Sequence, residues 1–173
     1  MRPVLIVPGY QNSGPGHWQS LWEASLGARR VEMPNWNFPR KAPWVEALDE
    51  AILKVGEAPV LVAHSLGCLA VAHWAREGSH EVAGALLVAP TDVERSDTPV
   101  PLKGFAPIPK GQLPFPSLLV AAEDDPFLAP ARARDLARSW GSRLHLFPAG
   151  GHLNTESGYG PWPAGEALLQ ELR

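Results

Sequence analysis

A serine stands where a short apolar strand is predicted to turn sharply into an apolar helix. The segment reads Val60-Leu-Val-Ala-His-Ser-Leu-Gly-Cys-Leu-Ala-Val-Ala-His-Trp74, with Ser65 at the junction. On such a turn the hydroxyl projects from the top of a sheet, and the N–H of Leu66 lies at the positive end of a helix, where it can bind an oxyanion. The segment therefore predicts a nucleophile. The alternative is a serine that only caps the helix.

The spacing of small residues around Ser65 supports the first interpretation. The positions two before and two after the serine crowd together in this turn, so the pattern is Gly-x-Ser-x-Gly. Here it reads Ala63-His64-Ser65-Leu66-Gly67, and alanine is still small enough to fit.

A serine hydroxyl is a weak nucleophile at neutral pH, so it needs a base, and the base needs an orienting carboxylate. In hydrolases with this turn the chain order is Ser, then Asp or Glu, then His, each on a loop after a strand. The apolar run 116–122 is followed by Glu123-Asp124-Asp125-Pro126, and the alternating run 143–147 leads to a glycine-rich loop that carries His152. His152 is therefore predicted to be the base.

The other histidines compete poorly for this role. His64 adjoins the serine but points away from it if the strand alternates, His73 falls inside the apolar helix, and His145 falls inside a strand. His17 and His80 fall in loops or at helix starts, where histidine is usually a solvated surface residue.

Three aspartates are candidates for the acid. Asp125 is favoured because Pro126 holds it in an extended conformation just before a predicted helix, which leaves the carboxylate on the loop rim. Asp124 is then a solvated neighbour or a helper. Asp92 follows the predicted strand 84–89, and its alternative role is an Asx-type turn.

The second oxyanion donor is expected from the glycine-rich loop 8–17 after the first strand. The backbone amide of Tyr10 is the first choice, with Gln11 behind it. A phosphate cradle is the competing interpretation, but the loop contains neither G-x-G-x-x-G nor a Walker Lys-Ser/Thr pair.

Two segments are candidates for the walls of a substrate pocket. The loop 34–44 carries three aromatic residues, and the proline-rich segment 91–116 lacks helical or strand periodicity. The candidate pocket residues are Trp36 and Phe38 in the first of these segments, together with Gln11 and His17 in the loop 8–17. Alternatively, the aromatic residues staple their loop to the core and the proline-rich segment is an inert connection.

The alternation of apolar runs with helical patterns predicts an α/β fold. With 173 residues the chain is expected to form a single domain over 1–173, a three-layer α/β/α sandwich without a large cap. Right-handed crossovers favour a mostly parallel six-stranded sheet in the order 2-1-3-4-5-6, in which Tyr10 and Ser65 meet at the switch point. The expected strands are about 3–7, 29–33, 59–63, 84–89, 117–122 and 143–147, and the expected helices are about 17–27, 43–55, 66–77, 129–140 and 162–172.

Composition narrows the range of partners. A net charge of -3 without a basic cluster argues against nucleic acid. The apolar stretch at the start is too short for a signal peptide or a membrane span, so we expect a cytoplasmic protein with no membrane partner. The single cysteine, Cys68, is expected in the core, and because no Cys/His cluster has metal-ligand spacing, no metal or cofactor is predicted.

The chain resembles the small serine hydrolases of the retinoblastoma-binding-protein-9 type, in the α/β-hydrolase superfamily. The ordered motifs that carry the resemblance are Pro8-Gly-Tyr10, Ser13-Gly-Pro-Gly-His-Trp-Gln19, Pro34-Asn-Trp36 with Trp44, Ala63-His-Ser-Leu-Gly67, Asp124-Asp-Pro126, Gly151-His-Leu-Asn154 and Gly158-Tyr-Gly-Pro-Trp-Pro163. The resemblance implies a nearly capless hydrolase fold and a triad of Ser65, Asp125 and His152. Retinoblastoma-type pocket proteins recognise Leu-x-Cys-x-Glu, a motif that this chain does not contain, so no such partner is predicted.

Together these features predict an enzyme that cleaves small ester or amide substrates through an acyl-enzyme on Ser65. One alternative is a binding or scaffold protein on the same fold. Another is an acyltransferase, thioesterase or aminopeptidase that uses the same triad.

Overall fold

Six parallel strands form one sheet in the order β2-β1-β3-β4-β5-β6 in the computed structural model, which describes residues 1–173. The strands are β1 Val4–Val7, β2 Arg29–Arg30, β3 Val60–His64, β4 Gly84–Val88, β5 Ser117–Ala122 and β6 Arg143–Phe147. Every neighbouring pair is parallel. The predicted fold class and strand order are confirmed.

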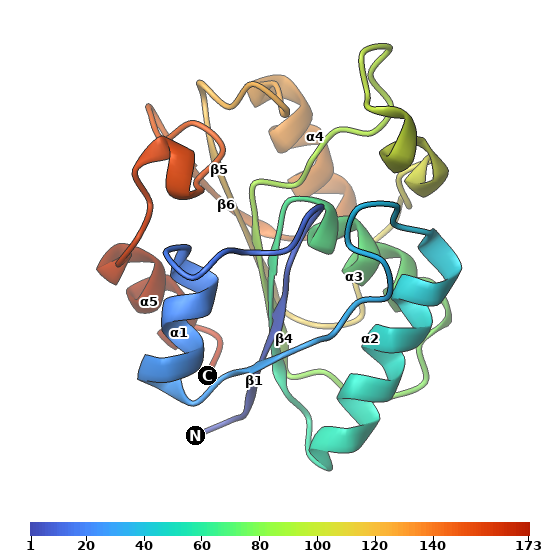
Figure 1. The fold of residues 1–173 in the computed structure, drawn as a ribbon, viewed down its shortest axis with the longest axis vertical. Coiled ribbons are helices and arrows are strands. Elements are labelled where there is room, and N and C mark those ends of the chain that lie inside the picture. The colour runs from blue at the N-terminus through green and yellow to red at the C-terminus, as the bar shows by residue number, and fades with distance from the viewer.

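Helices cover both faces of this sheet, with α1 and α5 on one side and α2, α3 and α4 on the other (Figure 1). The α-helices are α1 Trp18–Leu26, α2 Lys41–Val55, α3 Leu66–Glu77, α4 Pro130–Trp140 and α5 Pro163–Gln170, and two 3-10 helices are η1 Val100–Phe105 and η2 Thr155–Ser157. None of these helices combines the length and the apolar character that crossing a membrane requires.

The period-2 alternation of the strands divides the core into two clusters. In β1, Leu5 and Val7 face α2 and α3, while Val4 and Ile6 face α1 and α5. The central strands β3 and β4 are buried along their whole length, which explains their continuous apolar sequences.

The structure differs from the expected elements mainly at one edge and in the proline-rich segment. β2 contains two residues instead of five and lies at the edge of the sheet beside β1, although Val31 N–H still donates to the Ile6 carbonyl at 2.9 Å. The segment 91–116 contains η1, which the sequence pattern did not predict, and η1 packs against α3.

The order of the strands places a crevice where the chain changes direction. β1 lies between β2 and β3, so the chain leaves β1 toward one edge and later returns to its other side. Loops that follow two such strands leave the sheet in opposite directions, and ligands bind in the crevice between them. The loop after β1 and the turn after β3 therefore border this crevice, at the carboxyl ends of the strands.

Candidate active site

The turn between β3 and α3 holds Ser65 in a backbone conformation that few non-glycine residues adopt. Its φ is 55° and its ψ is -122°, and the N–H of Ser65 donates to the Val88 carbonyl of β4 at 2.9 Å. Such strain persists only when the surrounding structure holds it, and it is concentrated at functional sites. The strained turn directs the Ser65 side chain toward the loop that follows β6.

Three side chains from three loops form a continuous hydrogen-bonded chain. Ser65 Oγ lies 2.8 Å from Nε2 of His152, and Nδ1 of His152 lies 2.9 Å and 3.1 Å from the two carboxylate oxygens of Asp125. A carboxylate only accepts hydrogen bonds, so His152 carries its proton on Nδ1 and presents Nε2 as an acceptor for the serine hydroxyl. This is the geometry that a nucleophile, a base and an orienting acid require.

Asp125 is held by its own loop after β5. Its side chain is fully buried, and one carboxylate oxygen accepts the N–H of Phe127 at 2.8 Å. The Phe127 ring packs edge-on against the His152 ring, with the centroids 4.8 Å apart. These contacts fix the carboxylate and the imidazole relative to one another.

Asp124 supports the histidine loop and does not contact the histidine ring in any hydrogen bond of the structure. Its carboxylate accepts the backbone N–H groups of Gly150 and Gly151, both at 2.8 Å. These two hydrogen bonds, from Gly151 first and then Gly150, hold the pKa of the exposed Asp124 carboxyl below its ordinary value. Of the two roles considered for Asp124, the helper role agrees with this geometry.

Asp92 is not brought to the histidine. Its carboxylate accepts the N–H of Glu94 at 3.1 Å, as in an Asx turn, and forms an ion pair with Arg132 at 3.4 Å. The Asx-turn interpretation agrees with the structure, and Asp92 is removed from the candidate acids.

The loop after β1 packs directly on the serine turn. A Cβ atom on Gly9 would lie 2.9 Å from Ser65 Cβ and 3.1 Å from the backbone nitrogen of Leu66, so only glycine allows this approach. The N–H of the next candidate, Gln11, already donates to the Trp36 carbonyl at 3.1 Å. The geometry therefore favours the amides of Leu66 and Tyr10 over that of Gln11 as oxyanion donors.

A hollow of about 500 Å³ opens over Ser65 and His152. Its apolar lining residues include Leu102 of η1, Phe127 and Pro99, and its polar lining residues include Asn12, Asn154 and Glu156. Tyr10, Gln11 and His17 also line it, in agreement with their selection as site candidates.

The prediction that Trp36 and Phe38 line the substrate pocket is wrong. Trp36 is half-buried and packs edge-on against Trp44, with ring centroids 5.7 Å apart, and Phe38 is 67% exposed. Neither lines the hollow over Ser65. The loop that carries them folds back onto α2, so the staple interpretation is the correct one for Trp36. Leu102 of η1 is one of the apolar residues that line the hollow instead.

Two histidines that sequence patterns set aside as the base lie beside His152. As a residue at a helix start, His17 was expected to be solvated, but it is 5% exposed. It caps α1, because its Nδ1 accepts the N–H of Gln19 at 3.1 Å. His64 was expected to point away from Ser65, and it forms no hydrogen bond with the serine hydroxyl, but it lines the hollow and its Nε2 lies 2.9 Å from the His152 carbonyl oxygen. The ring centroids of His17 and His64 are 4.9 Å apart.

Burial keeps both of these histidines neutral. Burial, followed by the nearby Arg30 and His152, lowers the pKa of His17 to about 4, and burial lowers the pKa of His64 well below its ordinary value. The Nε2 of His17 is buried without a hydrogen-bond partner. In the sequence, only the position of His64 next to Ser65 pointed to a place in the site. That position does not identify the His152 carbonyl as its hydrogen-bond partner.

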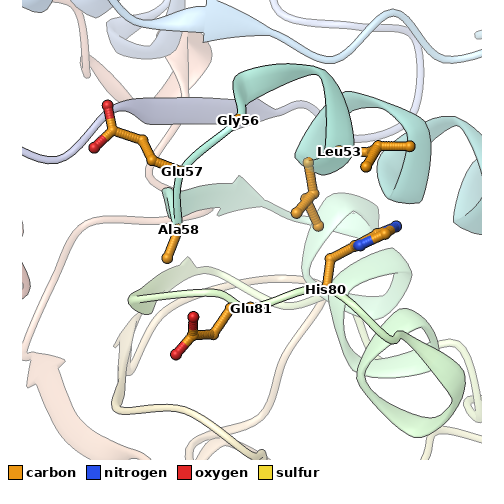
Figure 2. Close-up of a pocket in the computed structure, with 7 residues that line it drawn as sticks. Leu53, Gly56, Glu57, Ala58, His80 and Glu81 are labelled. Carbon is orange, nitrogen blue, oxygen red and sulfur yellow. The ribbon is translucent and has the colours of Figure 1, made fainter.

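A second hollow, of about 250 Å³, lies at the opposite end of the sheet between the end of α2 and the segment before β4 (Figure 2). Its lining residues are Ile52, Leu53, Gly56, Glu57, Ala58, His80 and Glu81. It contains no serine, threonine or cysteine, and its single histidine, His80, pairs with Asp49 at 3.4 Å. The nucleophile–base geometry is therefore found at the first hollow and not at this one.

Known proteins are similar to this chain in sequence and in fold. The YdeN protein of Bacillus subtilis (strain 168), described as a candidate hydrolase, is 24% identical over 176 residues, which cover 94% of this chain and 91% of YdeN. The crystal structure of that ydeN gene product superimposes with a TM-score of 0.81 over 99% of this chain and 98% of that one.

Two further structures extend the comparison. A YdeN-like candidate hydrolase from Pectobacterium atrosepticum is 31% identical, with a TM-score of 0.88 over 99% of this chain and 90% of that one. A thermophilic esterase from Thermogutta terrifontis is 18% identical and shares the fold, with a TM-score of 0.71 over 100% of this chain and 90% of that one.

The family model described as Serine hydrolase matches residues 4–171. This chain therefore belongs to the serine hydrolase family.

Proposed function

We propose that the protein hydrolyses small carboxylic esters through an acyl-enzyme on Ser65, with His152 as the base and Asp125 as the orienting acid. The observation that carries the proposal is the hydrogen-bonded chain from Ser65 Oγ to His152 Nε2 and from His152 Nδ1 to the Asp125 carboxylate. Membership of the serine hydrolase family supports the same reaction class.

The reaction begins with attack of Ser65 Oγ on the ester carbonyl carbon while His152 Nε2 accepts the hydroxyl proton. The carbonyl oxygen becomes an oxyanion that accepts hydrogen bonds from the backbone N–H groups of Leu66 and Tyr10. The imidazolium, stabilised by Asp125, then donates its proton to the departing alcohol as the carbon–oxygen bond breaks. In the second half, His152 removes a proton from water as the water attacks the acyl carbon. The bond from the acyl carbon to Ser65 Oγ then breaks, and His152 returns the proton to Ser65 Oγ, which releases the carboxylic acid and the free serine.

The mixed lining of the hollow supports a small substrate with an apolar and a polar part. Leu102, Phe127 and Pro99 suit a short acyl group, and polar residues that include Asn12 and Asn154 suit a polar leaving alcohol. The ordered motifs also support assignment to the retinoblastoma-binding-protein-9 type within the serine hydrolases. Ester preference is measured by comparing the hydrolysis of esters with that of amides and thioesters of the same acyl group.

The test is labelling with a fluorophosphonate probe, combined with a screen of esters, thioesters and amides of the same acyl group. We expect the probe to label Ser65, as mapped by peptide mass spectrometry, and Ser65→Ala to lower kcat for esters by about 10⁴ to 10⁶. Ser20→Ala is the control, because Ser20 Oγ donates to the Ser13 backbone carbonyl and Ser20 does not line the hollow over Ser65. Undiminished ester hydrolysis by Ser65→Ala, or a probe adduct on another residue, would contradict the proposal.

A further inference from the structure

The loop that carries His152 adopts a backbone conformation that needs external support. Gly151 and Leu153 flank the histidine, and both have positive φ angles, 54° and 50°. Leu153 has a side chain, so this left-handed conformation is unfavourable and persists only when neighbouring groups hold it. The position of the candidate base therefore depends on the groups that bind this loop.

His64 provides one of these bonds from across the sheet. Its Nε2 lies 2.9 Å from the His152 carbonyl oxygen, although the two residues are 88 positions apart in the sequence. A carbonyl oxygen only accepts, so Nε2 of His64 carries the proton and donates it. His64 is 6% exposed, and its ring centroid lies 5.0 Å from that of His152.

The neighbouring peptide groups are held in the same way. Trp18 Nε1–H donates to the Leu153 carbonyl at 2.8 Å, and Ser157 Oγ accepts the N–H of His152 at 3.1 Å. His64 differs from these partners because it is the last residue of β3 and immediately precedes Ser65. Its bond therefore joins the residue that carries the candidate base directly to the strand that carries the nucleophile.

The neutral state of His64 suits this position. Burial, followed by the nearby His152 and His17, lowers the pKa of His64 well below its ordinary value, so the ring donates without carrying a positive charge. When His152 becomes an imidazolium during the reaction, no second cation on His64 opposes it. A lysine or a charged histidine at the same place would repel the imidazolium.

We propose that His64 is a positioning residue, whose Nε2–H bond to the His152 carbonyl holds the base at hydrogen-bonding distance from Ser65. The inference rests on the proposed function of Ser65 and His152 and adds a residue to it. His64 acts through His152 and takes no part in bond making or proton transfer.

The test compares His64→Leu, which removes the donor, with His64→Gln, whose side-chain nitrogen is as many bonds from Cα as Nε2 of histidine. Because a misplacement of about 1 Å costs roughly 10²-fold in rate, we expect His64→Leu to lower kcat for a short p-nitrophenyl ester by about 10- to 100-fold, with KM within about threefold. His64→Gln should recover most of kcat. His64→Asn, whose amide is one bond too short, should resemble His64→Leu and replaces it if His64→Leu does not fold.

Trp140→Phe is the matched control. It also removes one ring N–H that donates to a backbone carbonyl, that of Pro109 at 2.8 Å, but it does so at the end of α4 away from Ser65. It should lower the free energy of unfolding without lowering kcat. This control separates the loss of a buried hydrogen bond in general from the loss of the bond to His152.

Two outcomes would overturn the inference: a folded His64→Leu or His64→Asn variant with wild-type kcat, or an equal loss of kcat in the Gln variant. NMR signals of the His152 imidazole provide a readout that does not depend on turnover, and we expect them to move or broaden in His64→Leu and to return in His64→Gln. A wild-type protein with neither turnover nor probe labelling would contradict the proposed function. The NMR comparison would still decide whether His64 holds the loop.

Discussion

A Cβ atom on Gly67 would lie 2.2 Å from the carbonyl oxygen of Val7. The first turn of α3 therefore packs directly on the end of β1, with no room for any side chain. This contact brings the serine turn and the loop after β1 together, and the two candidate oxyanion donors come from these two segments. The second glycine of the Gly-x-Ser-x-Gly pattern, Gly67, is thus required because the backbone of β1, which is remote in the sequence, leaves no space for a Cβ atom.

Gly67→Ala should be strongly destabilising, because the contact is with backbone and cannot be relieved by rotating a side chain. We expect the free energy of unfolding to fall by about 3 kcal/mol or more, at the upper end of overpacking effects. Chemical denaturation checks this value. Gly104→Ala is the control, because a Cβ there meets nothing within 4 Å. Equal stabilities of the two variants would contradict the explanation.

The two adjacent aspartates should differ sharply in their effect on catalysis. Asp125→Asn places an amide donor against Nδ1 of His152, which favours the wrong tautomer, so kcat should fall by about 10⁴. Asp124→Asn retains an oxygen that can accept from Gly150 and Gly151, so its loss should be about tenfold or less. Steady-state kinetics on one short ester compares them. The reverse ranking would assign the orienting role to Asp124.

The size of the hollow limits the acyl chain. Each methylene that is buried contributes about 0.8 kcal/mol, so kcat/KM should rise from acetate until the apolar lining residues Leu102, Phe127 and Pro99 are covered, at about butyrate or hexanoate. A series of p-nitrophenyl esters up to dodecanoate measures this. Phe38→Ala should not alter the series, because Phe38 is exposed and lies outside the hollow. Activity that still rises at dodecanoate would show a longer channel.

His17 should make the fold sensitive to acid. Its pKa in the folded protein is lowered from 6.5 to about 4, so between these values the unfolded chain binds a proton that the folded chain does not. The stabilisation is therefore fully present above pH 6.5 and is lost as the pH falls toward 4, by about 3 kcal/mol in total. The buried His64 acts in the same direction.

Urea denaturation at several pH values between 7.5 and 4 measures the effect. His17→Asn is the informative variant, because asparagine can still cap α1 by accepting the N–H of Gln19 but does not titrate. It should show a shallower decrease in the free energy of unfolding. The same slope in both proteins would mean that His17 does not carry the dependence.

The local patterns of the sequence determined the order of the sheet and the three segments that meet at the candidate site. Strand and helix periods are read over a few residues, and right-handed crossovers convert their order into a topology. The positions of Ser65 after β3, Asp125 after β5 and His152 after β6 therefore followed from the chain itself. The catalytic roles of these three residues and the oxyanion roles of Tyr10 and Leu66 stay predictions.

The tertiary structure decided which side chains surround that site. Leu102 lines the hollow because η1 folds onto α3, whereas Trp36 packs on Trp44. His64 meets the carbonyl of a residue 88 positions away, and the burial of His17 depends on the packing of α1 against the sheet. No local period encodes these contacts, because the direction of a loop side chain and the partner of a buried polar group depend on segments that become neighbours only when the chain is folded.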